Sequence, residues 1–438
     1  MTGPRNRGRR AASGCSGAPG SQCVTPADRA TQAEAPATNG DPSPSHIPLP
    51  AWVPTDGVIG SRPDRQVLVV GHTPTGFALT LLLGDAGYDP VLVCSTDPPA
   101  RSRVTALSPA AVEVLGSLGL GTHVTSRGRR VDQVTVRRPD ADDGRDRRTT
   151  GSLTGDSGRA PPIVIQTPVL RRILGGRVPD HVAVGARRIE SVVSGDGGVA
   201  VTFDDGVREW FDVVVDAGSA SESIGQGDRE MDSVPLVQFE TTLDENADRR
   251  GIGETWRPTT VVQRFPVAAG DRPVLRITTS VTDGSIDEVR LPTGNDRSEV
   301  CRVPDSGAFE RSRVRQVRLG ERDTPRRWWG DGRIARCGPA AFPAVPATGI
   351  GPSLGITDAL GLVYAVAQNG TAVPDAIASY TARRARRVTA LRRAATGFDH
   401  QIRFSRTPPL GSVYSLRAVA LEPYFGGVPG ALREVGRE

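Results

Sequence analysis

The stretch QVLVVGHTPTGFALTLLLGDAGYDPVLVC (residues 66–94) decides the fold. It begins with a short apolar run at 66–70, bends at Gly-His-Thr-Pro-Thr-Gly (71–76), continues with helical character over 77–86 and ends in a second apolar run at 90–94. A strand, a glycine turn, a helix and a strand within about 30 residues form a βαβ unit, in which the helix is the crossover between parallel strands. The stretch therefore predicts an α/β fold with a dinucleotide-binding parallel sheet.

Composition indicates a soluble globular protein of two or three domains. The chain has 438 residues, 37% hydrophobic and 24% charged, which excludes a collagen, a coiled coil and a fully disordered chain. All 54 basic residues are Arg, so every mechanism that needs a lysine is excluded, including a Schiff base and a P-loop. The net charge of +5 favours an acidic partner only weakly, because 49 acidic residues are interleaved with the arginines, and no nucleic-acid binding is expected.

The cysteines and the apolar runs favour a cytoplasmic location. The five cysteines are odd in number and have no C-x-x-C spacing, so neither a disulfide framework nor a zinc site is predicted, and no metal is expected. A reducing cytoplasm is the expected compartment. The longest strongly apolar stretch, 76–83, is much shorter than the roughly 18 residues of a transmembrane helix, so no membrane span is predicted.

Shifts in composition divide the chain into five segments. Residues 1–64 are rich in Gly, Pro, Ser, Ala and Thr, and we expect a disordered tail there. The α/β pattern occupies 65–235 and returns at 326–398. Strand-like runs separated by turns fill 236–325, which predicts a sheet-rich second domain, and 399–438 is a C-terminal extension.

Finer patterns predict single elements. Ser108 and Pro109 suit the N-cap and first position of a helix that extends to residue 118. Two further helices are expected at 358–368 and 375–393. Residues 137–160 are charged and Gly-rich, which favours a surface loop.

Four separated segments carry the residues that point to a chemistry. They are Val69-Val70-Gly71-x-Thr73-x-x-Gly76; Arg103-x-x-x-Leu107-Ser108 with Leu115-x-x-Leu118-Gly119-Leu120; Asp212-Val213-Val214-Val215-Asp216-Ala217-Gly218; and Gly332-Arg333-Ile334-x-x-Cys337-Gly338-Pro339-Ala340-Ala341 with Gly349, Gly351 and Asp358. In this order and spacing, over roughly residues 65–395, the chain resembles the FAD-dependent aromatic hydroxylases of the p-hydroxybenzoate hydroxylase type.

The resemblance implies a Rossmann-like FAD-binding domain with a parallel sheet, interrupted by a sheet-rich substrate domain. It implies a monooxygenase-type oxidoreductase for a small apolar or aromatic substrate that lies beneath the 236–320 sheet, and it leaves a nicotinamide nucleotide open as electron donor. FAD would carry the chemistry while the protein binds, orients and shields it, so no catalytic triad is expected and the catalytic residues stay unassigned. The cofactor-binding residues that it implies are Gly71, Thr73, Gly76, Arg103, Gly338, Pro339, Gly349 and Gly351.

The departures from the family pattern fall on positions that would touch FAD. Thr73 replaces the glycine that lets the backbone approach the pyrophosphate, and its β-branched side chain is expected to intrude there and to disfavour a glycine-like backbone. Cys94 stands in place of the acid that binds the ribose, and Pro339 in place of the aspartate that holds the ribityl chain. The third carboxylate, Asp216, is displaced by two positions or lost. Asp358 is retained, near an expected helix start that suits its charge.

Two functions therefore stay open from the sequence. The first is an FAD-dependent monooxygenase with an eroded cofactor site, and the second is a flavin-free relative that keeps the fold and binds a ligand or a protein. Other groups have structural interpretations. We expect His72 to face solvent, Cys94 and Cys337 to be buried thiols, and Arg383 and Arg384 to be exposed.

Overall fold

The computed structural model describes fourteen segments of the chain, all within the unit that spans residues 47–438. They are residues 66–94, 104–139, 146–152, 161–195, 197–218, 224, 233–242, 251–257, 260–268, 273–280, 310–317, 330–341, 351–369 and 372–385. The expected tail at 1–64 and the expected extension at 399–438 lie outside these residues. Within them, no helix is long and apolar enough to cross a membrane.

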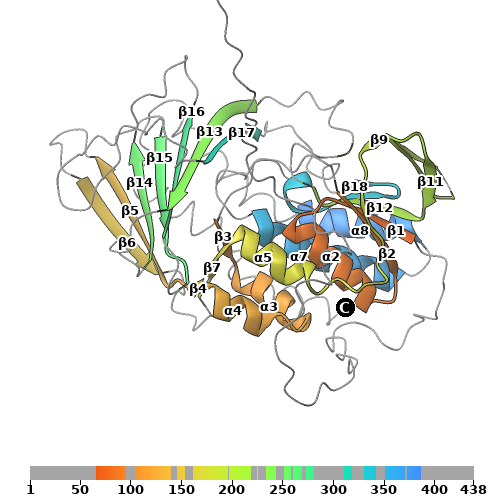
Figure 1. Cartoon of the computed structure of the whole chain (residues 1–438), viewed down its shortest axis with the longest axis horizontal. Helices are drawn as coiled ribbons and strands as arrows, with labels where there is room; N and C mark the ends of the chain where they lie inside the picture. Colours follow the sequence, from red (N-terminus) through yellow and green to blue (C-terminus); the bar gives the residue numbers. More distant parts are fainter. Residues whose placement is uncertain are drawn as a thin grey trace, which may run out of the picture. The chain divides into compact units, whose positions relative to one another are not determined.

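A six-stranded sheet forms the centre of the α/β part, with the strand order β18-β19-β12-β1-β2-β8 (Figure 1). Its strands are β1 (Gln66–Val70), β2 (Asp89–Cys94), β8 (Val184–Ala186), β12 (Val213–Asp216), β18 (Gly330–Asp331) and β19 (Ile334–Arg336). β1 pairs in parallel with β2 and β12, and β2–β8 and β12–β19 are parallel as well. The predicted parallel α/β sheet is confirmed.

β1 is apolar from Val67 to Val70 because both of its faces are covered. Val67 and Val69 of β1 belong to the core cluster that the helices form, whereas Leu68 and Val70 pack with a second cluster on the opposite face. That second cluster is completed by the antiparallel sheet β11-β10-β9, made of β9 (Ile189–Ser194), β10 (Val199–Phe203) and β11 (Arg208–Phe211). A strand buried on both faces appears in the sequence as a continuous apolar run, and this is the pattern found at 66–70.

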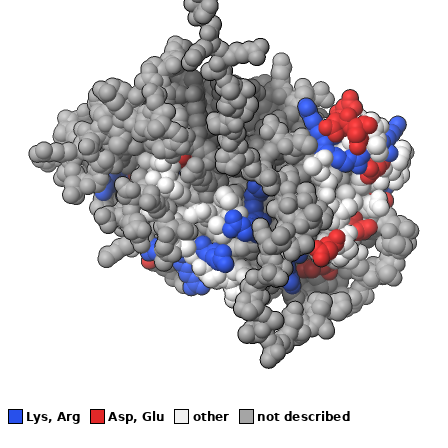
Figure 2. All heavy atoms as spheres, viewed as in Figure 1, with Lys and Arg blue, Asp and Glu red and all other residues white. Residues whose placement is uncertain are grey.

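Charges of both signs lie side by side near β9 and β11 on the face drawn in Figure 2. Arg187 pairs there with Glu209 at 2.5 Å and with Asp205 at 3.2 Å. The arginine also lies over the Phe203 ring, 3.7 Å from its centroid. Interleaving of the arginines with acids therefore occurs in space as well as in sequence.

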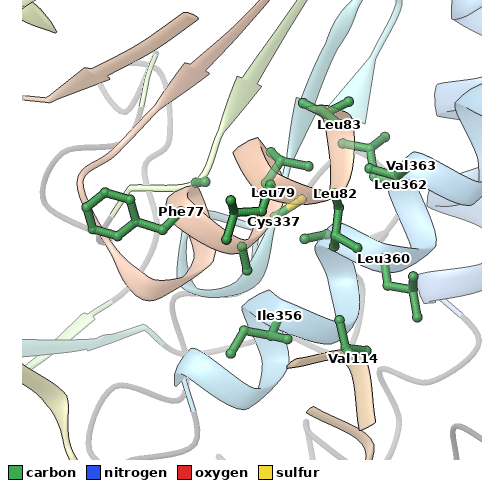
Figure 3. Packing of buried hydrophobic residues seen from close by; sticks show 14 of the residues in the cluster. Phe77, Leu79, Leu82, Leu83, Val114, Cys337, Ile356, Leu360, Leu362 and Val363 are labelled. Atoms are coloured by element: carbon green, nitrogen blue, oxygen red, sulfur yellow. The ribbon is translucent and has the colours of Figure 1, made fainter. Parts of the chain in front are cut away.

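Two helices carry the core on the other face. They are α2 (Pro74–Asp85) and α7 (Gly351–Asn369). Residues 74–83 of α2 are all buried, so the helix is covered around its whole circumference and is largely apolar. Figure 3 shows Leu79 and Leu82 of α2 gathered with Leu360 and Val363 of α7, with the sulfur of Cys337 among them.

Further short elements surround this core. They are the helices α3 (Pro109–Ser117), α4 (Gly121–Arg127), α5 (Thr167–Gly175) and α8 (Val373–Ala385), and the antiparallel strands β3 (Val104–Leu107), β7 (Ile163–Gln166) and β4 (Arg129–Arg130). Ser108 caps α3 by accepting a hydrogen bond from the Ala111 N–H, as its position before Pro109 predicted.

The sheet-rich part is a seven-stranded sheet in the order β17-β13-β16-β15-β14-β5-β6. Its strands are β5 (Gln133–Pro139), β6 (Asp146–Ser152), β13 (Ser233–Thr242), β14 (Ile252–Arg257), β15 (Thr260–Phe265), β16 (Val274–Ser280) and β17 (Glu310–Val317). The surface loop expected at 137–160 is wrong, because β6 and the end of β5 lie within it and form a hairpin. β5 pairs in parallel with β14. The charged β6 is the outer strand of the sheet, a place that tolerates charge.

Candidate functional site

The turn that follows β1 forms the base of the candidate site. Gly71 has φ +121°, a region that side-chain-bearing residues rarely adopt, and a Cβ there would lie 2.6 Å from Gly218 Cα. The Gly71 N–H donates to the Val93 carbonyl of β2 at 2.8 Å, and Ala217 N–H donates to the Val70 carbonyl at 2.8 Å. The turn is thus held at the carboxyl ends of three adjacent parallel strands, the edge at which open α/β sheets bind ligands.

Gly76 is required by a close approach between α2 and this turn. A Cβ on Gly76 would lie 1.9 Å from the carbonyl oxygen of Gly71. The helix can therefore start directly over the strand end only with glycine at this position, the role that the sequence pattern assigns to it.

Thr73 is the N-cap of α2, and its backbone conformation is an ordinary one. Its φ of −110° and ψ of 165° are extended, so the predicted conflict between a β-branched residue and the local backbone is wrong. The Thr73 hydroxyl donates to the Ala217 carbonyl at 2.7 Å and accepts the Gly76 N–H at 3.1 Å. Both partners belong to the protein, so this hydroxyl joins the start of α2 to the end of β12.

His72 is half-buried and does not face solvent freely, in contrast to the expectation. Its Nδ1 lies 2.9 Å from Nη2 of Arg171 on α5, and its ring meets the edge of Phe77 with 4.5 Å between centroids. Because the guanidinium can only donate, Nδ1 accepts and carries no proton in this arrangement. The signal missed in the sequence is that the bulky residue in the turn has an arginine partner 99 positions later.

The second glycine-rich segment meets the first through Thr75. Gly338 has φ +59°, and a Cβ there would lie 2.6 Å from Gly355 Cα and 3.4 Å from Thr75 Oγ1. A Cβ on Gly355 would lie 1.8 Å from the same hydroxyl oxygen. The first turn of α2 and the start of α7 thus pack against each other with no room for larger residues.

Pro339 lies against Gly351 at the first position of α7. A Cβ on Gly351 would be 3.0 Å from Pro339 Cγ. The structure therefore brings six of the eight predicted cofactor residues into two adjoining contacts, one around Gly71 and one around Gly338. The other two, Arg103 and Gly349, lie outside the described residues.

Asp358 was expected near a helix start. Instead it lies in the interior of α7, where it is completely buried. Its Oδ2 accepts the Gly338 N–H at 2.7 Å, and its Oδ1 forms an ion pair with Arg384 of α8. Arg384 is only 8% exposed, so its expected exposure is wrong. The basic run in α8 concealed this partner, because sequence spacing does not show which arginine turns inward.

Asp216 at the end of β12 shapes the turn beside Gly71. It is completely buried, and its two carboxylate oxygens accept the N–H groups of Gly218, at 3.1 Å, and Ile224, at 2.8 Å. The carboxylate that stands two positions from the family pattern therefore binds its own loop. It fixes the residues that cross over Gly71.

Cys337 is a buried thiol, as expected. Its Sγ lies 3.5 Å from the Tyr380 hydroxyl, which donates to the Arg336 carbonyl at 2.8 Å. Burial raises the pKa of this thiol to about 12. Cys94, where the family has an acid, is the last residue of β2.

The backbone at this turn suits a dinucleotide, but part of its hydrogen-bonding capacity is already used. The strand end, the tight turn and the start of α2 have the arrangement that accepts a pyrophosphate at a helix N-terminus. However, Pro74 and Pro339 have no N–H, and the N–H groups of Gly76 and Gly338 donate to Thr73 and Asp358. These four positions therefore offer no further backbone N–H group to a bound anion.

A comparison with family models identifies the first part of the chain. Residues 64–261 match the model of an FAD binding domain. No curated protein matches the sequence. The matched residues include the Gly71 turn, β2, β12 and the strands β13 to β14 of the larger sheet.

Solved structures share the fold over most of the chain. PqsL of P. aeruginosa, in complex with 2-aminobenzoylacetate, is 21% identical with a TM-score of 0.64, and the match covers 81% of this chain and 99% of that one. HpxO of Klebsiella pneumoniae, in complex with FAD and uric acid, is 18% identical with a TM-score of 0.58, over 85% of this chain and 93% of that one. A salicylate hydroxylase substrate complex is 17% identical with a TM-score of 0.61, over 85% and 98%. Through residues 64–261 the chain is therefore similar to the FAD binding domain family, and it shares the fold of PqsL, HpxO and salicylate hydroxylase.

Proposed function

We propose that the protein is an FAD-dependent monooxygenase that acts on a small aromatic substrate and holds FAD weakly. The observation that supports this most is the contact between the two glycine-rich segments. Gly338 lies within reach of Thr75, directly beside the Gly71 turn at the carboxyl end of the sheet. Segments that are more than 260 residues apart in the chain meet where the family holds its cofactor.

The residues of this chain have separable roles in that proposal. Gly71 and Gly76 shape the turn over which the pyrophosphate lies, with Thr73 capping α2 beside it. Pro339 and Gly351 would line the rest of the cofactor, and the family resemblance adds Gly349 and Arg103 to the expected cofactor-binding residues. FAD, when bound, supplies the redox chemistry, and the protein orients it and excludes water. A nicotinamide nucleotide is the electron donor that we expect.

The weak affinity follows from the groups that would touch FAD. A hydrogen bond to a charged group contributes about 1.5 to 3 kcal/mol. Loss of two carboxylates, at Cys94 and Pro339, with crowding at Thr73, therefore reduces affinity by roughly 4 to 8 kcal/mol, or on the order of a thousandfold to a millionfold. The two buried acids near the turn, Asp216 and Asp358, accept backbone N–H groups of the protein itself.

A second function is a flavin-free protein with the same fold that binds a ligand or a partner. This function is favoured because the backbone N–H groups of Gly76 and Gly338 already donate to acceptors within the protein. A site whose donors are satisfied needs no anionic ligand to complete it.

The visible spectrum of the purified protein separates these two functions. The protein is recorded as purified and again after incubation with excess FAD and removal of the free cofactor. A flavin absorption band at a molar ratio near one supports the enzyme, and oxidation of NADH or NADPH in the presence of candidate aromatic compounds then defines it. The absence of a flavin band, even at high FAD concentration, contradicts the enzyme and supports the flavin-free function.

A further inference from the structure

One face of the seven-stranded sheet carries a row of four buried polar side chains. Glu240 of β13 pairs in register with Arg276 of β16, Arg276 with Gln263 of β15, and Gln263 with Glu254 of β14. Residues directly opposite each other across strands project from the same face, so the four form one continuous row. Their exposed fractions are 3%, 0%, 2% and 2%. Polar and charged residues are rarely buried to this degree unless they are paired.

Three of the four residues are held by one another or by the rest of the fold. Arg276 Nε donates to Glu240 Oε1 at 2.5 Å, and its guanidinium lies over the Phe265 ring, 4.8 Å from the centroid. Arg276 Nη2 donates to the Val104 carbonyl at 2.7 Å. Val104 directly follows Arg103, one of the predicted cofactor residues. This hydrogen bond places the row on the side of the sheet that meets the FAD-binding part.

The hydrogen bonding of Gln263 is incomplete. Its Nε2 donates to Glu254 Oε1 at 2.7 Å, and a carboxylate can only accept, so the amide must turn its N–H group to Glu254. Its carbonyl oxygen Oε1 is buried and has no partner among the described residues. An acceptor in this state costs free energy, which a ligand with a hydrogen-bond donor would recover.

We propose that this row, which we call the Glu240–Glu254 row, selects the substrate, and that the substrate carries a neutral N–H or O–H donor that binds Gln263 Oε1. The inference rests on the proposed function, because it takes this face of the sheet as the substrate side. An aromatic carboxylate can only accept hydrogen bonds, so it would bring a second acceptor against Gln263 Oε1. The substrate is therefore an aromatic amide, amine or phenol and not an aromatic acid.

Three compounds of nearly equal shape test the proposal by binding alone. Benzamide has the donor, acetophenone replaces the amino group by a methyl group, and benzoate replaces it by a charged oxygen. Their dissociation constants are measured by saturation-transfer difference NMR on the full chain, both as purified and with added FAD. We expect benzamide to bind about tenfold more tightly than acetophenone, since one hydrogen bond is worth about that factor, and benzoate to bind most weakly.

A variant assigns the preference to Gln263. Gln263→Met keeps the length of the side chain and removes the acceptor, so the preference for benzamide over acetophenone is expected to disappear. Gln238→Met is the matched control, because Gln238 lies on the same face, is 3% exposed and donates to Thr278 at 3.2 Å, and it should retain the preference. The comparison of the three compounds on the unaltered protein needs no variant to fold.

The outcomes separate this inference from the proposed enzyme. Equal affinities for benzamide and acetophenone, tighter binding of benzoate, or no saturation transfer to any of the three compounds would overturn the assignment of the row. A preference for benzamide without any flavin band supports the row and contradicts the enzyme. A flavin band without the preference for benzamide supports the enzyme and contradicts the role of the row.

Discussion

The carboxylate of Asp358, in the middle of α7, accepts the backbone N–H of Gly338 at 2.7 Å. This hydrogen bond joins the helix to the short segment that follows β19, and it fixes the glycine whose φ is +59°. The other carboxylate oxygen pairs with Arg384 of α8. One buried acid therefore holds three parts of the candidate site in place.

Replacement of this acid should destabilise the whole fold. Asp358→Asn removes the carboxylate that pairs with the buried Arg384 guanidinium, and breaking a buried pair in this way costs about 3 to 5 kcal/mol. We expect a decrease of that size in the free energy of unfolding measured by urea denaturation. The same change in the exposed pair, Asp205→Asn, is the control and should leave stability nearly unchanged. Equal effects of the two substitutions would contradict the importance of the buried pair.

Two glycines of α2 provide a matched test of the close approach at the turn. A Cβ on Gly76 would lie 1.9 Å from the Gly71 carbonyl oxygen, whereas a Cβ on Gly84 would meet nothing within 4 Å. Gly76→Ala is expected to lower the free energy of unfolding by at least about 3 kcal/mol, because backbone must move. Gly84→Ala should raise it by about 0.5 to 1 kcal/mol through helix propensity. Thermal unfolding followed by circular dichroism measures both, and a neutral Gly76→Ala would show that the turn is looser than described.

The Cys337 thiol should be unreactive until the protein unfolds. Burial raises its pKa from 9.0 to about 12, so the thiolate is scarce in the folded state at pH 8. In a variant with serine at the other four cysteine positions, iodoacetamide should label Cys337 in urea and leave it unmodified in buffer. Rapid labelling of the folded protein would contradict its burial.

The same shift makes the stability of the protein depend on alkaline pH. The folded state keeps the thiol proton more firmly than the unfolded state does, so this contribution is fully present below pH 9 and is lost as the pH rises toward 12. We expect the free energy of unfolding to fall more steeply between pH 9 and pH 11 in the unaltered protein than in Cys337→Ala. Parallel curves for the two proteins would show that the thiol does not contribute.

The sequence predicted those parts of the fold that local patterns encode. The apolar run at 66–70, the glycines at 71 and 76 and the Ser108-Pro109 pair have strong local preferences, and each element formed as expected. The hairpin β5–β6 was missed because charged residues occur in it, and the pairing of β5 with β14 joins segments more than 100 residues apart. Likewise, the partners of His72, Asp358 and Gln263 depend on long-range contacts that no local pattern contains. Asp358 was expected near a helix start because the helix was predicted to begin at residue 358. It lies in the interior instead, because α7 begins seven residues earlier.

The affinity for FAD should rise when two of the departures from the family pattern are reversed. Thr73→Gly releases the Gly76 N–H, which the threonine hydroxyl now accepts at 3.1 Å, and Pro339→Asp supplies a carboxylate beside Gly351. Glycine is an adequate N-cap, so the first change costs α2 only a few tenths of a kcal/mol. One charged hydrogen bond contributes about 1.5 to 3 kcal/mol, so the double variant should bind FAD about tenfold to a hundredfold more tightly. Quenching of FAD fluorescence during titration measures this affinity. Thr73→Ser, which keeps the hydroxyl, should show no gain. If the double variant binds FAD no better than the unaltered chain, FAD does not lie along the Gly71 turn.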